Sequence, residues 1–131
     1  MATLIPALST CTSRMTSGER RLAERLERKL EDDYMLWYDV PVGPKQTHPD
    51  FVVIHPRRGV LILEVKDWKL ATIQRATRQI WEIIPNGEVK VVINPLAQAR
   101  HCAIQVVNAL ERDPPLVQSD GQHKGKLAFP W

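Results

Sequence analysis

The sequence predicts an α/β protein in which a mixed central β-sheet is flanked by α-helices. Residues 51–54 and 60–65 are continuous apolar runs rich in β-branched side chains, a pattern typical of strands buried on both faces of a sheet. Residues 17–33 and 94–112 instead place their apolar side chains at helical spacing. An order of helix, strands and helix favours helices packed on a sheet.

The composition is that of one compact globular domain. The chain has 131 residues, with 44% hydrophobic and 25% charged side chains, which argues against a disordered or fibrous protein. Its formal net charge of +3 is too small to identify a partner. No apolar run is long enough to cross a bilayer, and two cysteines are too few for a disulfide framework. We therefore expect a cytoplasmic protein without a membrane partner.

The chain divides into a short lead-in and one domain. Residues 1–15 are expected to form a flexible N-terminal segment, and residues 16–131 the domain, whose C-terminal end we expect to be truncated. Thr16 and Glu19 have the spacing of a capping box, which predicts that the first helix begins there. Residues 34–43 then predict a short strand that runs into a turn.

Two hairpins and a second helix follow. The runs 51–54 and 60–65 form the first hairpin, and residues 67–74 continue or bend its second strand. Residues 80–84 and 88–93 form another hairpin, since Asn86 and Gly87 are a strong turn signal. Asn94 and Pro95 suit the N-cap and first position of the last helix.

The first hairpin brings together side chains that a folding argument would keep apart. If Ile54 faces Val60, Asp50 lies directly opposite Glu64, where like charges destabilise a strand pair. Lys66 falls on the same face as Glu64. Two carboxylates are ligands for Mg²⁺, and a lysine can orient an attacking water. This pattern predicts a metal-dependent phosphodiester-cleaving site; alternatively, Glu64 and Lys66 form an exposed ion pair and Asp50 is a turn residue.

These residues resemble a known nuclease motif. Pro49-Asp50, followed by Glu64-Val65-Lys66, resembles the signature of the PD-(D/E)xK nuclease superfamily. Over about residues 17–112 the chain is similar to the nuclease-related domain, NERD, through the segments GERRLAERL, HPDFVVIHPRRGVLILEVKDWK and NPLAQAR. The version here is similar to the NERD domains N-terminal to bacterial superfamily-one helicases.

The resemblance implies a restriction-endonuclease-like core that cleaves DNA with Mg²⁺ or Mn²⁺. Asp50 and Glu64 would be metal ligands, the Val65 carbonyl would complete the coordination, and Lys66 would activate the water. The protein would then be a deoxyribonuclease, and by analogy the nuclease part of a helicase-nuclease in DNA processing or repair. The alternative is a non-catalytic nucleic-acid-binding module on the same scaffold.

The resemblance also implies roles for two helix residues. Glu19 falls where related nucleases place a first-helix acid near the metal, although a capping box also explains it. Gln98 matches a second-helix glutamine that is associated with the active site in the family. Its position in the sequence alone would predict only a solvent-facing residue. Both are therefore candidate catalytic residues.

Basic and aromatic residues near these acids are candidates for DNA contacts. Residues 34–100 contain nine basic and six acidic side chains, so the whole excess of positive charge surrounds the predicted site. Trp68 and Trp81 could stack on bases or serve only as packing. DNA is the expected partner, with a helicase domain in the same longer chain and a homodimer as further expectations. The candidate phosphate contacts are Lys69, Arg57, Arg58 and Arg100, of which the arginine pair is also explained as a solvated turn.

Overall fold

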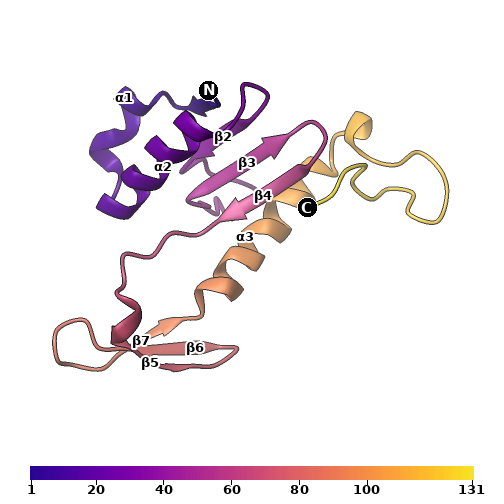
Figure 1. Cartoon of the computed structure of the whole chain (residues 1–131). Helices are drawn as coiled ribbons and strands as arrows, with labels where there is room; N and C mark the ends of the chain where they lie inside the picture. Colours follow the sequence, from indigo (N-terminus) through magenta and orange to yellow (C-terminus); the bar gives the residue numbers. More distant parts are fainter.

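A four-stranded mixed sheet forms the centre of the molecule. The computed structural model describes residues 1–131, and its main sheet has the order β1-β2-β3-β4 (Figure 1). β1 runs parallel to β2, whereas the other neighbours are antiparallel. The mixed α/β fold predicted from the sequence is therefore confirmed. The strands are β1 (Thr3–Ile5), β2 (Met35–Tyr38), β3 (Phe51–His55) and β4 (Gly59–Leu63).

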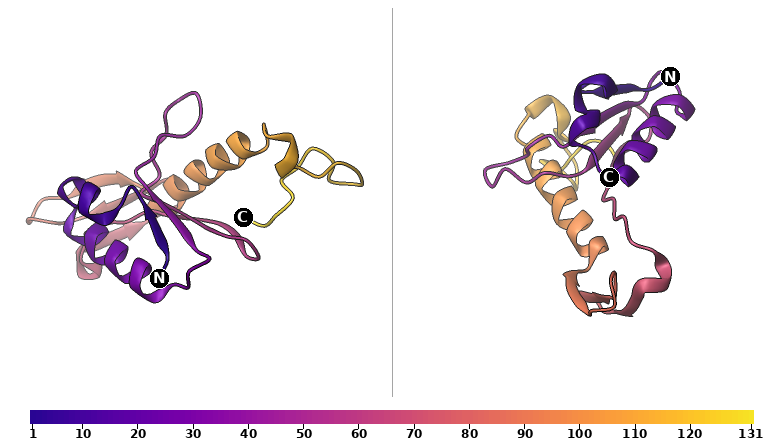
Figure 2. Two further views of the ribbon diagram at one scale, coloured as in Figure 1. Left: turned by 90° about the horizontal axis from the view of Figure 1, so that it is seen from above. Right: turned by 90° about the vertical axis from the view of Figure 1, so that its left-hand side faces the viewer.

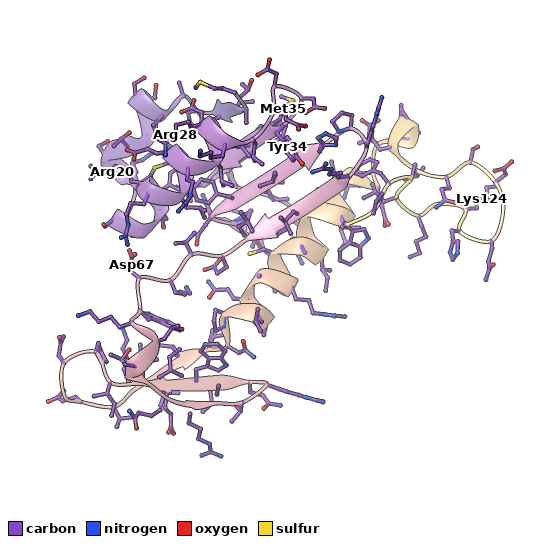
Figure 3. All side chains as sticks on the ribbon, viewed as in Figure 1. Arg20, Arg28, Tyr34, Met35, Asp67 and Lys124 are labelled. Atoms are coloured by element: carbon purple, nitrogen blue, oxygen red, sulfur yellow. The ribbon has the colours of Figure 1, made fainter.

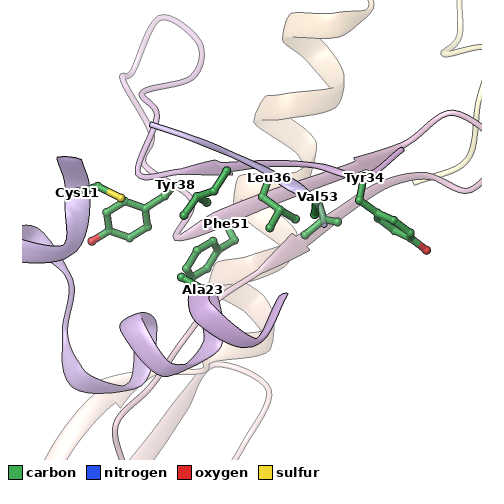
Figure 4. Close-up of a cluster of buried hydrophobic side chains, with 9 residues drawn as sticks. Cys11, Ala23, Tyr34, Leu36, Tyr38, Phe51 and Val53 are labelled. Atoms are coloured by element: carbon green, nitrogen blue, oxygen red, sulfur yellow. The ribbon is translucent and has the colours of Figure 1, made fainter. Parts of the chain in front are cut away.

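Helices cover both faces of this sheet (Figure 2). Helix α2 (Ser17–Lys29) packs against the face that carries Phe51, and its Ala23 is fully buried there (Figure 4). Helix α3 (Pro95–Leu110) packs against the opposite face, where Val106 joins Val52. Neighbouring residues of β3 thus point to different helices, as the alternation of side chains along a strand requires.

Residues 1–15 are ordered, which corrects the expectation of a flexible lead-in. β1 pairs with β2, and the short helix α1 (Leu8–Cys11) follows. Leu4 and Cys11 are buried in the core shared with α2. The apolar start of the chain therefore extends the sheet and covers its edge. A three-residue strand is too short to produce a readable period, so the sequence pattern missed it.

The second hairpin does not join the main sheet, so the prediction of one central sheet is wrong in this respect. β5 (Ile73–Ala76), β6 (Ile80–Ile83) and β7 (Lys90–Ile93) form a separate three-stranded sheet. The chain leaves β4 as an extended segment, passes the 3₁₀ turn Leu70–Thr72 and returns through α3 (Figures 1 and 2). β4 is consequently an edge strand, and its Leu61 is 56% exposed rather than buried on both faces.

The C-terminal segment lies against the outer side of β4. The Val60 amide donates a hydrogen bond to the Pro130 carbonyl at 3.0 Å. A Cβ atom at Gly59, whose φ is +87°, would lie 1.9 Å from that carbonyl oxygen, so only glycine fits there. Leu127, which belongs to the same C-terminal segment, is buried. The 3₁₀ turn Pro114–Leu116 links this segment to α3. None of the helices combines the length and apolar character needed to span a bilayer.

Candidate active site

The register of the β3–β4 hairpin brings two carboxylates to the same end. Ile54 pairs with Val60 and Phe51 with Leu63, so the predicted register is confirmed. Asp50 directly precedes β3 and Glu64 directly follows β4. The Val65 amide donates a hydrogen bond to Asp50 Oδ2 at 2.7 Å. This bond ties the two strand ends together and holds the Asp50 carboxylate.

Glu64 is a buried carboxylate with one oxygen left unpaired. Its side chain is 5% exposed, and Oε1 accepts a hydrogen bond from Lys66 Nζ at 3.0 Å. Oε2 is buried without any hydrogen-bond partner. Such a group costs free energy in the apo fold, because it has lost water and gained nothing in return. A buried carboxylate oxygen without a partner is the arrangement expected of a ligand for a hard cation such as Mg²⁺.

The environment of Asp50 makes its carboxyl harder to ionise. Burial raises the pKa of Asp50, and the negative charges of Glu64 and Glu19 act in the same direction. The Val65 amide and the Lys66 ammonium oppose that rise. Three acids thus share one partly buried site, which is a frequent property of functional carboxylates. A bound cation would relieve the repulsion among them.

Glu19 is both a helix cap and a neighbour of the acids. The capping box with Thr16 is present, so that prediction is confirmed. Glu19 Oε2 accepts hydrogen bonds from the Tyr38 hydroxyl at 2.7 Å and from the Thr16 amide at 3.1 Å. Burial and this bond to Glu19 raise the pKa of Tyr38 above its ordinary range. Unlike Glu64, Glu19 is therefore satisfied by protein partners.

Helix α3 passes beside the carboxylates. Burial, followed by the charges of Glu64 and Asp50, raises the pKa of the Cys102 thiol, which places this part of α3 close to both acids. Gln98 is one turn earlier, on the same side of the helix as Cys102. Its side chain makes no hydrogen bond to the acids. The cavity beside Glu64 is lined by Leu96 and Ala99 of this helix but not by Gln98.

The four candidate phosphate contacts lie in two different places. Arg57 and Arg58 are in the β3–β4 turn, at the opposite end of the hairpin from Glu64. There Arg58 donates a hydrogen bond to the Tyr34 hydroxyl. Lys69 is exposed in the segment that follows β4, and Arg100 is exposed on the first half of α3. The four side chains therefore do not form one basic patch around the acids.

A cavity opens beside Glu64 and Lys66. Its volume is about 410 Å³, and its walls come from the end of β4, the start of α3 and the separate small sheet. Sequence reasoning did not place the small sheet at the site, because no local pattern reports how a detached hairpin is oriented. The remaining lining residues are Ile62, Leu63, Trp68, Leu70, Ile73, Trp81, Pro95, Leu96 and Ala99.

A second group of potential ligands lies at the other end of β3. Polar atoms of Glu31, Asp33 and His55 all lie within 4.8 Å of one another. The ring of His55 is buried, its Nε2 is 2.9 Å from Asp33 Oδ2, and its Nδ1 accepts a hydrogen bond from the Arg57 amide. The accepting Nδ1 leaves the proton on Nε2, which donates to Asp33. Both ring nitrogens are thus occupied, so His55 has no lone pair for a cation.

The donor set at Asp50 and Glu64 fits Mg²⁺ or Mn²⁺. These ions prefer carboxylate and carbonyl oxygens, which Asp50, Glu64 and the Val65 backbone supply. The unpaired Glu64 Oε2 supports this fit independently of any sequence motif.

Comparison with known proteins identifies the family. No curated protein and no solved structure gives a significant match to the chain. The family model for the nuclease-related domain, NERD, matches residues 14–126, which is most of the chain. The acids of the hairpin lie within this matched region. The chain therefore belongs to the NERD family.

Proposed function

We propose that this NERD domain is a Mg²⁺- or Mn²⁺-dependent deoxyribonuclease that hydrolyses phosphodiester bonds. The buried, unpaired Oε2 of Glu64 is the observation that carries the proposal. A carboxylate that served only as an ion-pair partner for Lys66 would keep its second oxygen in water. Here that oxygen is desolvated next to Asp50, an arrangement that stores unfavourable energy which a cation would release.

The residues of the site divide the work of hydrolysis. Asp50, Glu64 and the Val65 carbonyl would hold the metal, which supplies Lewis-acid stabilisation of the charge that develops on the phosphate. Lys66 is held on the same face through its 3.0 Å bond to Glu64 Oε1. From there its ammonium group can align a water for in-line attack on phosphorus and balance negative charge. The Val65 amide keeps Asp50 oriented toward the shared site.

DNA as the substrate is supported by charge and by the family. The basic excess of residues 34–100 surrounds the acids, and positive charge attracts a polyanionic backbone. The nuclease-related family model covers the same residues. A role in DNA processing or repair together with a helicase is a further part of the proposal, supported by similarity to helicase-linked NERD domains.

The direct test is cleavage of single-stranded, duplex and branched DNA with Mg²⁺, Mn²⁺ or a chelator. We expect cleavage only with metal, and its loss in Glu64→Gln, which removes the charge while keeping the shape. Glu88→Gln is the matched control, because Glu88 is exposed in the small-sheet turn. Cleavage that persists in chelator or in Glu64→Gln would contradict the proposal. DNA binding without cleavage in any metal would instead indicate the non-catalytic module.

A further inference from the structure

The cavity beside Glu64 has chemically different walls. Glu64 and Lys66 form one part, whereas Trp68, in the segment that follows β4, and Trp81 of β6 contribute aromatic surface. The other lining side chains are apolar. A volume of about 410 Å³ falls in the range of small-ligand pockets. The Glu64 side of the predicted metal site therefore borders an apolar, aromatic recess. Figure 3 shows Asp67 on the extended segment that leads from β4 toward the small sheet.

The two tryptophans retain ring surface that packing does not use. Their ring centroids are 6.3 Å apart and the planes are tilted by 50°. Both side chains are half-buried, so part of each indole faces the cavity. Lys66 Nζ lies 5.9 Å from the centroid of the Trp68 ring. The residue proposed to align the attacking water is thus adjacent to an aromatic face.

An unpaired nucleotide is the ligand that matches both walls. Its base can stack on an indole ring regardless of sequence, while its phosphate extends toward the acids and Lys66. A duplex offers this cavity little, because its bases are already stacked and its outer surface consists of phosphates and sugars. An apolar recess provides no hydrogen bonds for that surface.

Positive charge around the cavity fits a single strand that continues beyond the bound base. Lys69 lies between the lining residues Trp68 and Leu70 in sequence, and Arg100 lines a neighbouring cavity that shares Ile62 and Ala99 with this one. Both side chains are exposed. A basic rim that follows the backbone and an aromatic platform for the bases are the two parts of a single-strand binding groove.

We propose that this cavity binds an unpaired base of single-stranded DNA and thereby makes single strands or unpaired ends the preferred substrate. The inference rests on the proposed nuclease function for its catalytic consequence, but the binding step can be measured separately. Trp81 and Trp68 are the stacking residues, and Lys69 and Arg100 contact the neighbouring phosphates.

Binding is tested with the full chain in a chelator, where metal-dependent cleavage does not occur. The probes are a fluorescein-labelled oligothymidylate of about a dozen nucleotides and a blunt-ended duplex hairpin, measured by fluorescence anisotropy. We expect Trp81→Leu and Trp68→Leu each to weaken oligothymidylate binding about tenfold, since a base–aromatic stack is lost. Duplex binding should be unchanged. Trp81→Phe should restore most of the affinity, because it keeps an aromatic face.

Controls separate stacking from a folding defect. Trp131→Leu is the matched variant, because Trp131 is 59% exposed and does not line this cavity; it should bind both probes normally. In the unmodified protein, oligothymidylate should quench tryptophan fluorescence, and this measurement needs no substitution. Equal affinity for both probes, or equal weakening of both by the leucine variants, would overturn the inference.

Cleavage of the same two DNAs in Mn²⁺ distinguishes the two proposals. We expect faster cleavage of the single strand, with Trp81→Leu raising KM more than it lowers kcat. Tryptophan-dependent binding without any cleavage would contradict the nuclease function and support the binding inference. Metal-dependent cleavage that ignores both tryptophans would support the nuclease function and overturn the binding inference.

Discussion

The two ends of the β3–β4 hairpin carry similar residues in opposite states. At one end, Glu64 Oε2 is buried and unpaired beside Asp50. At the other end, His55 is equally buried, but it donates to Asp33 and accepts from the Arg57 amide. Both ends contain groups that bind metals in other proteins. Only the first end leaves a buried ligand atom without a hydrogen-bond partner.

The difference shows that a set of ligand types does not by itself make a metal site. Buried polar groups are normally satisfied, so a buried side chain whose polar atoms already have partners has a structural explanation. The His55–Asp33 pair belongs to that class and stabilises the apo fold. The Glu64 site destabilises it locally, which is a common feature of functional sites. We therefore expect metal and activity to depend on one end and stability on the other.

Outside the metal ligands, loss of the lysine should have the greatest consequence for cleavage. Lys66→Met keeps the length of the side chain but removes the ammonium group that balances charge at the reacting phosphate. We expect kcat for Mn²⁺-dependent cleavage to fall about 100-fold or more, measured in single-turnover assays. Arg58→Met, at the opposite end of the hairpin, is the control and should keep its activity. Similar rates for Lys66→Met and the unmodified protein would contradict the role of Lys66.

Metal binding should stabilise the protein through the Asp50–Glu64 site and not through the His55 end. At about 100 times its Kd, Mn²⁺ should add about 2.7 kcal/mol to the free energy of unfolding, seen as a rise in Tm. We expect Glu64→Gln to abolish that rise and Asp33→Asn to retain it. A rise that survives Glu64→Gln and disappears in Asp33→Asn would instead place the ion at the His55 end.

Removing Asp33 should lower stability without affecting catalysis. Asp33→Ala leaves the buried Nε2–H of His55 without its acceptor, which we expect to cost about 1–2 kcal/mol in urea unfolding. The rate of metal-dependent cleavage should match that of the unmodified protein. Glu31→Ala is the control, because no hydrogen bond or ion pair joins Glu31 to His55. Unchanged stability in Asp33→Ala would show that the pair contributes nothing.

A smaller effect is expected at Tyr38, which donates to Glu19 near the active acids. Tyr38→Phe should cost about 1 kcal/mol of stability. The raised pKa of Tyr38 means that the native state keeps a proton that the unfolded state releases above about pH 10. Stability should therefore fall as pH rises beyond that point. Tyr38→Phe should reduce this slope, measured by urea unfolding at alkaline pH; an identical slope would contradict the assignment.

Local sequence patterns predicted the structure correctly wherever it depends on residues that are close together in the sequence. The capping box at Thr16, the N-cap at Asn94 and the hairpin register of Ile54 and Val60 all appear as predicted. The position of Asp50 opposite Glu64 followed directly from that register, because one known pair of facing residues fixes all the other pairs of an antiparallel hairpin. The burial of Glu64 did not follow, because it depends on tertiary packing that the pairing of two strands does not describe.

Other features depended on packing that no local pattern describes. β1 is only three residues long and is stable because β2 supplies its hydrogen bonds. The second hairpin is compatible with either the main sheet or a sheet of its own, and the extended segment after β4 decides between them. The His55–Asp33 pair joins residues from two elements that are separate in sequence.

The sequence by itself determined the α/β class, where both long helices begin and the alignment of two acids with a lysine, because each depends on periodicity or on near neighbours. It did not give β1 and α1, and the first helix ends at Lys29 rather than near Asp33. The tertiary structure alone decided which carboxylate oxygen is deprived of water, which acidic cluster is satisfied, and that two tryptophans line the cavity beside the acids. Desolvation and cavity shape arise from atoms brought together across the whole chain. For that reason the structure was needed to distinguish the proposed catalytic end of the hairpin from its stabilising end.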